Sequence, residues 1–107
     1  MNKGEVWQAE LPSSNGREQA GTRPVLVVAE TDADVALIIP FTSSITALRF
    51  SHTLEIKPSM ENGLDTASIC LLFQLRAMDK KRLKSKRGTL EDVTLQMINA
   101  GLRKLLV

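Results

Sequence analysis

The chain has 107 residues, a length typical of one domain, and its net charge is only +2. Hydrophobic residues make up 43% of it, which is enough to form a core, and charged residues make up 24%. No apolar run approaches the roughly 20 residues that a membrane-spanning helix needs, and the first residues do not resemble a signal peptide. We therefore expect a soluble, cytoplasmic protein with one domain, residues 1–107, and no membrane contact.

The chemistry open to this chain is restricted by its single histidine, His52, and its single cysteine, Cys70. One histidine excludes a site with two histidine ligands, and one cysteine excludes a multi-cysteine zinc site and an internal disulfide. Neither GxxxxGK[ST] nor GxGxxG occurs. We expect no metal and no cofactor. If the protein is an enzyme, it works with Arg, Thr, Ser, Asp, Glu and Gln side chains.

The first half of the chain reads as three strands and one long loop. The alternation in GEVWQAEL (4–11) predicts a strand with one wet face. Residues 11–22, rich in Pro, Ser, Asn and Gly, form a loop. VLVVAE (25–30) is a continuous apolar run and predicts a strand buried on both faces. VALIIPFT (35–42) predicts a third strand, in which Pro40 indicates an edge or a bulge.

The middle of the chain predicts two more strands and a basic connector. Residues 43–50 resemble a loop, and SHTLEIK (51–57) alternates cleanly as a fourth strand. PSMENGLDT (58–66) reads as a turn, and ASICLLFQL (67–75) as a fifth, buried strand that includes Cys70. Residues 76–87 read as an irregular basic connector.

The hydrophobic period changes to that of a helix in the last part of the chain. The positions that carry this period are Leu90, Val93, Met97, Ile98, Leu102 and Leu105. We expect a helix from about Leu90 to Leu106, with Thr89 and Asp92 as a variant capping box. Gly101 inside it costs about 1 kcal/mol relative to alanine and suggests close approach of another element. Five strands and one helix predict a mainly β protein, a small antiparallel barrel with a helical lid.

Two features leave alternatives open. In KKRLKSKR (80–87), six of eight residues are Lys or Arg, and such a run is either a solvated turn or a phosphate-binding edge. Aromatic residues are only 4%, so the four rings are also needed for the core, and stacking is expected to be a small part of any recognition. These rings are Trp7, Phe41, Phe50 and Phe73.

Polar side chains gather at the predicted strand ends. GREQAGTRPVLVV (16–28) places several of them directly before the buried second strand, and others follow the third and fifth strands. In a barrel that brings these strands together, we expect the side chains to converge at one rim. They are Arg17, Glu18, Gln19, Arg23, Thr42, Ser43, Ser44, Gln74, Arg76 and Asp79.

Such a set suits cleavage of RNA by its own 2′-hydroxyl, which needs neither a protein nucleophile nor a metal. It needs a base, donors for the growing phosphate charge and a proton source for the leaving oxygen. Arg23 can clamp a phosphate bidentately, and Thr42 or Ser43 can donate a further hydrogen bond. Glu18 or Asp79 can act as the base if its pKa is raised. The competing interpretation is purely structural: loop-bracing ion pairs, strand-end capping and a satisfied core amide.

Four segments, taken together, resemble a known family. GEVW, EQAGTRPVLVV, IIPFTSS and GLDTASICLLFQLRAMDKKRL are similar, in order and spacing, to segments of the MazF/PemK (Kid) toxins of bacterial toxin–antitoxin systems. The match covers most of the chain. The resemblance implies an SH3-like barrel, a homodimer, and sequence-specific, metal-independent ribonuclease activity on single-stranded mRNA. It further implies 2′,3′-cyclic phosphate and 5′-hydroxyl ends, and neutralisation by a cognate antitoxin whose acidic tail covers the RNA groove. We expect no DNA contact by the toxin itself.

Carried onto matching positions, the resemblance implies that Arg23 and Thr42 are the catalytic pair. Arg23 stabilises phosphate charge and is a candidate to protonate the leaving oxygen, while Thr42 bonds the scissile phosphate. The resemblance also assigns groove-lining roles to Glu18, Gln19, Ser43 and Gln74. One branch of the family has a histidine before the Glu-Gln pair and an Arg and an Asp after strand five. Arg76 and Asp79 match the last two, but Arg17 stands at the histidine position, so the base stays open between Asp79, Glu18 and water.

Two other functions compete with this one. A gyrase poison on the same barrel would be a non-enzymatic toxin, although the EQAGTRP loop is not expected there. An inactive RNA-binding module is suggested by the basic run at residues 80–87.

Overall fold

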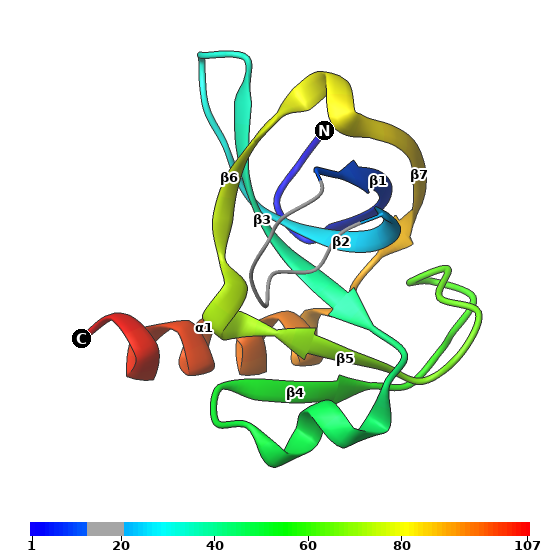
Figure 1. Cartoon of the computed structure of the whole chain (residues 1–107), viewed down its shortest axis with the longest axis vertical. Coiled ribbons are helices and arrows are strands. Elements are labelled where there is room, and N and C mark those ends of the chain that lie inside the picture. The colour runs from blue at the N-terminus through cyan, green and yellow to red at the C-terminus, as the bar shows by residue number, and fades with distance from the viewer. Residues whose placement is uncertain (13–20) are drawn as a thin grey trace.

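The computed structural model describes residues 1–12 and 21–107 and shows a strongly bent antiparallel sheet with one α-helix (Figure 1). The strands are β1 (Glu5–Leu11), β2 (Gly21–Glu30), β3 (Val35–Thr42), β4 (Thr53–Ile56), β5 (Ser68–Leu71), β6 (Arg76–Asp79) and β7 (Leu83–Thr89). The helices are the 3₁₀ turns η1 (Ile45–Arg49), η2 (Leu72–Gln74) and η3 (Lys80–Arg82), and α1 (Asp92–Leu106). The strand order is β4-β5-β3-β2-β1-β7, with β6 paired to β3. The predicted mainly β class, a small barrel with a C-terminal helix, is confirmed.

Strand β3 lies at the centre of the sheet and has three partners. One edge pairs with β2, while the other pairs first with β6, over Val35–Ile38, and then with β5, at Phe41 and Thr42. Ile39 and Pro40 fall between the last residue paired with β6 and the first paired with β5. Pro40 is predicted to mark an edge or a bulge. It pairs with Val25 of β2, and on its other side it falls in the short unpaired stretch where β3 changes partners, so its missing N–H interrupts the pairing with neither β6 nor β5.

Both faces of β2 and β3 are buried, as predicted for the run 25–30. Leu26 and Ile39 belong to one core, which also contains Ile98 of α1. Val27 and Ile38, on the opposite face, belong to a second core inside the barrel. Since successive side chains of a strand point to opposite faces, an uninterrupted apolar run fills both cores at once.

The basic connector predicted at residues 76–87 is instead ordered as β6, η3 and β7. Figure 1 shows these elements curving round β1 and β2 to give the barrel-like shape. Only Met78 and Leu83 of this segment are buried in the barrel core, so the strand pattern is hidden among charges. Within the described residues, Lys80 Nζ lies 3.1 Å from Glu30 Oε1, so this cation braces the end of β2. The solvated-turn interpretation of the basic run holds only in part: Lys81, Lys84 and Lys86 are exposed and Lys80–Arg82 is a turn, but the run continues as a strand from Leu83.

Three other predicted boundaries shift for local reasons. The fourth strand begins at Thr53 because His52 has a φ of 61°, in the left-handed region. The buried strand 67–75 ends at Leu71, where the chain enters η2. The helix begins at Asp92, and its N-cap is Glu91 without a side-chain cap bond, so the predicted capping box is wrong. Thr89 is the last residue of β7 instead. The predicted loop 43–50 contains η1.

None of the helices in the described ranges is long and apolar enough to cross a membrane.

Gly101 allows α1 to approach η2, as its place in the helix suggested. A Cβ at this position would lie 2.6 Å from Leu72 Cδ2, and Leu72 is buried in the core beneath the helix. The glycine therefore fixes how closely the helix covers the sheet at η2.

We predict that Gly101→Ala gives none of the stabilisation usual for this change in a helix. The gain of about 1 kcal/mol in helix propensity is offset by about 1–3 kcal/mol of overpacking against Leu72. In a Leu72→Ala background the same substitution should raise the free energy of unfolding by about 1 kcal/mol. Urea unfolding of the four proteins measures this coupling, and equal effects of Gly101→Ala in both backgrounds would contradict the packing argument.

Glu5 ties β1 to β7 at the base of the barrel. Its carboxylate accepts a hydrogen bond of 2.9 Å from Trp7 Nε1 and lies 3.3 Å from Lys86 Nζ. Burial raises the pKa of Glu5. Hydrogen bonds from Trp7, the Asn2 backbone and Lys86, together with the charge of Lys86, lower it by more than burial raises it. The pKa therefore lies below its usual value.

Because the pKa of Glu5 is lowered on folding, its contribution to stability is present above about pH 4.5 and is lost as the pH falls through the folded-state pKa. Glu5→Gln should therefore lower the free energy of unfolding by about 1 kcal/mol at pH 7, and the difference from wild type should be smaller at pH 3, below the usual pKa of 4.5. Urea unfolding at both pH values measures the effect. Glu55→Gln, at an exposed position of β4, is the matched control. A difference that persists at low pH would show that packing, and not the charge, is responsible.

Candidate functional site

A small pocket lies where β2 begins and β3 ends. Continuing the β2–β3 register beyond the Val25–Pro40 pair places Arg23 opposite Thr42. Both side chains line a cavity of about 170 Å³, together with Ser43. Thr42 is only 8% exposed and Arg23 is partly buried, whereas Ser43 is exposed. The structure therefore brings together three of the predicted site residues; we call this cavity the Arg23 pocket.

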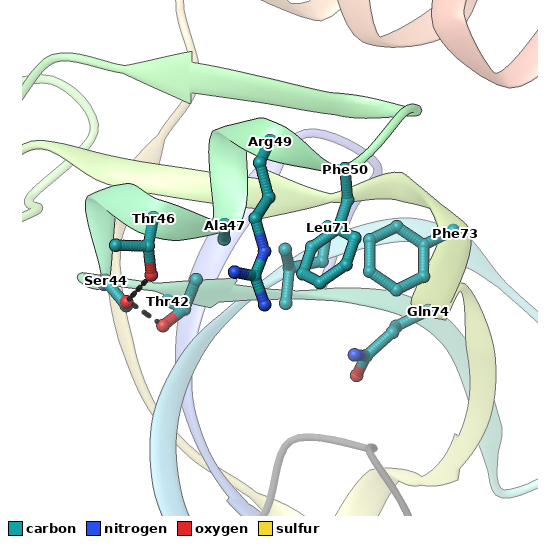
Figure 2. A pocket seen from close by; sticks show the side chains of 9 residues that line it. All are labelled: Thr42, Ser44, Thr46, Ala47, Arg49, Phe50, Leu71, Phe73 and Gln74. Carbon is teal, nitrogen blue, oxygen red and sulfur yellow. Dashed lines mark hydrogen bonds between the residues drawn. The ribbon is translucent and has the colours of Figure 1, made fainter.

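A second, larger hollow of about 480 Å³ also has Thr42 in its wall (Figure 2). We call it the aromatic hollow; its walls include Thr42, Ser44, Arg49, Phe50, Phe73 and Gln74. The backbone N–H of Ser44 donates to Thr42 Oγ1 over 3.2 Å, and the hydroxyls of Ser44 and Thr46 are 2.9 Å apart. Gln74, on η2, thus reaches the site through this hollow and not through the Arg23 pocket.

The expectation that all four aromatic rings serve the core is wrong for two of them. Phe41 is fully buried and Trp7 packs partly buried against the barrel core. Phe50 is 47% exposed and Phe73 is 42% exposed; Phe50 is the C-cap residue of η1 and Phe73 lies within η2, so neither is on a strand.

Arg76 and Asp79 lie apart from this site. Both line a third hollow, beside Arg82. Asp79 pairs with Val35, the first residue of β3, while Thr42 is the last. At about 3.3 Å per residue, the two ends of that strand are roughly 20 Å apart. Asp79 Oδ1 instead accepts from the Lys81 backbone N–H over 3.1 Å and caps η3. The expected convergence of Asp79 with Arg23 and Thr42 does not occur within the described chain.

The predicted groove residues Arg17, Glu18 and Gln19 lie outside the described residues.

Arg87 is a residue of the Arg23 pocket that the sequence did not single out. Its Nη2 lies 2.8 Å from Asp65 Oδ2, its Nε donates to the Gly63 carbonyl over 3.0 Å, and its Nη1 donates to Gln8 Oε1 over 2.9 Å. In the sequence it is the last of six cations in the basic run, and nothing there distinguishes it. The guanidinium joins β1, β7 and the turn 58–66.

This turn lies directly on β7. A Cβ at Gly63 would collide with the Arg87 backbone, and one at Gly88 would collide with the backbone of the turn. Gly63 also has a φ of 69°, which favours glycine. The Thr89 N–H donates to the Glu61 carbonyl over 2.8 Å. Gly63 and Gly88 each allow a close backbone approach, but the sequence does not show that the two segments meet, so it does not identify Arg87.

The turn is also ordered from within by Asn62, which is fully buried. Its Oδ1 accepts from the N–H groups of Ser59 and Leu64, each over 3.0 Å, and its Nδ2 donates to the Lys57 carbonyl over 2.9 Å. A buried amide with its bonds satisfied fixes a loop conformation. Asp65, which follows in the turn, is thereby held at the wall of the Arg23 pocket.

The charges of the Arg23 pocket favour an anion. Its described lining residues include two arginines, Arg23 and Arg87, and one acid, Asp65, which pairs with Arg87, so their formal charges sum to a positive value. Cys70 pairs with Phe41 nearby but is fully buried. Burial raises the pKa of its thiol well above the usual value, so it is not a nucleophile. Across residues 1–12 and 21–107, no cluster of three or more His, Cys, Asp or Glu residues could hold a metal ion.

Several solved structures share this small barrel fold. MazF of Deinococcus radiodurans in its form I matches with a TM-score of 0.81 at 18% identity, covering 99% of this chain and 96% of that one. An endoribonuclease in complex with its cognate antitoxin from a mycobacterial species matches with a TM-score of 0.71 at 19% identity, covering 97% and 92%. The D. radiodurans MazE–MazF structure, form II, matches with a TM-score of 0.73 at 21% identity, covering 99% of this chain and 95% of that one.

The sequence identifies the family within this fold class. The model for the PemK-like, MazF-like toxins of type II toxin–antitoxin systems matches residues 2–106. The Endoribonuclease MazF of Staphylococcus saprophyticus is 32% identical over 103 residues, covering 92% of this chain and 85% of that protein. The chain belongs to the PemK-like, MazF-like toxin family.

We predict that Arg87→Gln loosens the turn 58–66, because it removes the ion pair with Asp65 and the Nε bond to Gly63. The free energy of unfolding should fall by about 1–3 kcal/mol, and backbone amides of the turn should exchange faster with solvent. Lys84→Gln, at an exposed position on the same strand, is the matched control and should change stability by less than about 0.5 kcal/mol. Hydrogen exchange measures both, and unchanged protection of the turn in Arg87→Gln would show that Arg87 does not hold it.

Proposed function

We propose that this chain is a sequence-specific endoribonuclease toxin. It cleaves single-stranded RNA, chiefly mRNA, by attack of a 2′-hydroxyl on the adjacent phosphate, and it needs no metal. The observation that carries the proposal is the placement of Arg23 opposite Thr42 in a positively charged pocket. Membership of the MazF-like toxin family and the name of the staphylococcal relative support it.

The pocket supplies what the charge of the reaction requires. The 2′-oxygen attacks phosphorus, the bond to the 5′-oxygen breaks, and a 2′,3′-cyclic phosphate and a 5′-hydroxyl remain. Negative charge grows on the non-bridging oxygens, where the guanidinium of Arg23 stabilises it. Thr42 Oγ1 accepts a bond from the Ser44 N–H through a lone pair, which directs its hydroxyl proton away from Ser44 and toward a phosphate oxygen. Arg23 is also a candidate to protonate the leaving 5′-oxygen, and Ser43, exposed beside Thr42, is a further donor to the phosphate.

The position of Asp79 narrows the choice of base. Because Asp79 lies at the opposite end of β3 from Thr42, Glu18 or a water molecule is the better candidate to accept the 2′-proton. In this proposal Arg17, Gln19 and Gln74 contact the RNA beside the reacting phosphate. Arg76 contacts the same RNA further from that phosphate.

The same proposal includes a cognate antitoxin that neutralises the toxin, a homodimer, a cytoplasmic location and a single toxin domain. Two of the solved relatives are described as complexes, one with a cognate antitoxin and one of MazE with MazF. The positive pocket is open to an acidic segment of such a partner as well as to RNA.

We predict that the purified protein cuts a long defined RNA in excess EDTA and leaves 2′,3′-cyclic phosphate ends. Arg23→Ala and Thr42→Val should each lower the cleavage rate about 10²–10³-fold, since each removes one donor to the transition state. Primer extension maps the cut sites, and the end chemistry is read by mass spectrometry. Arg103→Ala, exposed on α1, is the control and should cut at the wild-type rate.

Three outcomes would count against this function. Cleavage by Arg23→Ala at the wild-type rate would remove the assigned role of that residue. Salt-sensitive RNA binding without any cleavage would favour a binding module. Gyrase-dependent DNA breaks with intact RNA would favour a gyrase poison.

A further inference from the structure

The aromatic hollow presents two apolar rings to solvent in a small protein. The rings of Phe50 and Phe73 are 6.0 Å apart between centroids and inclined at 63°, an edge-to-face pair. Backbone bonds hold the segments that carry the rings: the Phe50 N–H caps η1 by donating to the Ala47 carbonyl, and Leu75 closes η2, which contains Phe73, by donating to the Leu72 carbonyl. The contact between the rings restrains the side chains further. Rings fixed in this way lose little further conformational entropy when a ligand stacks on them.

A guanidinium completes the surface. Arg49 Cζ lies 4.8 Å from the centroid of Phe50, and Figure 2 shows the side chain reaching down between Thr42 and the Phe50 ring. A cation held against an aromatic face is itself a flat stacking surface. The hollow therefore combines three planar groups with the polar side chain of Gln74, which Figure 2 places below Phe73.

The hollow adjoins the Arg23 pocket through a single residue. Thr42 lines both cavities, so a ligand whose phosphate meets Arg23 and Thr42 can extend directly into the hollow. No Asp or Glu is among the described residues that line the hollow, and Arg49 adds a positive charge. A volume of about 480 Å³ is within the range of small-ligand sites. These features suit a planar group carried on a polyanion.

We infer that the aromatic hollow is a subsite for one unpaired nucleobase of the RNA, next to the scissile phosphate. The base stacks on Phe50, Phe73 and the Arg49 guanidinium, and the Gln74 amide meets its hydrogen-bonding edge. Unstacked bases of single-stranded RNA are bound by aromatic rings and arginine planes in this way. The inference rests on the proposed function, because it takes Arg23 and Thr42 as the phosphate site.

The test pairs protein variants with altered RNA. Wild type, Phe50→Leu, Phe73→Leu and Arg49→Gln are assayed on the RNA mapped above and on copies with one abasic nucleotide at each position flanking the cut. Leucine keeps the apolar contact with the fold but removes the ring. The phenylalanine variants should lower kcat/KM about 5- to 150-fold on intact RNA, the equivalent of one stacked base. On the RNA that lacks the base at one particular position, wild type and variants should cut equally.

A binding arm does not depend on cleavage. Fluorescence anisotropy follows binding of an uncleavable 2′-fluoro copy of the same RNA, with 2-aminopurine scanned along it to report stacking by quenching. One position should be quenched by wild type and recover in Phe73→Leu. Val93→Ala, an exposed apolar position on α1, is the matched control and should behave as wild type in both arms.

The outcomes separate this inference from the proposed function. Absence of cleavage by wild type, with base-specific quenching intact, overturns the ribonuclease and leaves the base subsite standing. Cleavage by wild type, with both phenylalanine variants cutting at the wild-type rate, overturns the subsite alone. The phenylalanine variants could instead change the sedimentation coefficient or antitoxin binding and lower kcat/KM equally on intact and abasic RNA. In that case the hollow is a protein contact and the inference is wrong.

Discussion

The two-sided burial of β3 is the constraint on which the rest of this molecule depends. Its alternate side chains fill the helix-covered core and the barrel core, and its edge changes from β6 to β5 at Ile39–Pro40. A one-residue slip would exchange the two sets of side chains between cores of different shape, so the register is strongly specified. Because Thr42 ends this strand, the same register fixes its position, including its place opposite Arg23 on β2. The packing of the two cores thus determines where Thr42 and Arg23 lie relative to each other.

The opposite wall of the pocket is set by a different means. The turn 58–66 contributes almost no apolar burial apart from Leu64, and it is held by hydrogen bonds and backbone proximity. Asn62 orders it from within, while Arg87 and the contact at Gly63 fix it to β7. One wall is therefore specified by hydrophobic packing and the other by polar geometry. We expect the conformation of the polar wall to be more sensitive to salt concentration and to the loss of a single hydrogen-bonding group.

Much of the fold could be predicted from the sequence wherever the hydrophobic period was strong. The strands at 25–30 and 35–42 and the final helix follow from their apolar patterns. β6 and β7 could not be found in this way, because Met78 and Leu83 alone reach the core and charged residues surround them. The separation of Asp79 from Thr42 was equally hidden, since it depends on β6 pairing with the start of β3. Local patterns carry no information on which distant strand provides the partner.

For the site, the sequence indicated Arg23, Thr42 and Ser43 correctly as neighbours, because strand ends of an antiparallel pair meet. It could not indicate Arg87, whose role follows from a close approach of two backbone segments 24 residues apart in sequence, Gly63 and Arg87. Nor could it show that Phe50 and Phe73 face solvent. A phenylalanine in an apolar segment reads as core, and only the 3₁₀ turn at residues 72–74 rotates Leu72 inward and Phe73 outward.

That rotation links two parts of the molecule that lie back to back. Leu72 meets α1 at Gly101 on the inner side of η2, while Phe73 faces the hollow on the outer side. Leu72 and Phe73 are consecutive, so one peptide bond joins the residue beneath the helix to the exposed ring. A substitution that displaces Leu72 from Gly101 would therefore act on the residue next to the exposed ring, and one that moves Phe73 would act on the residue beneath the helix.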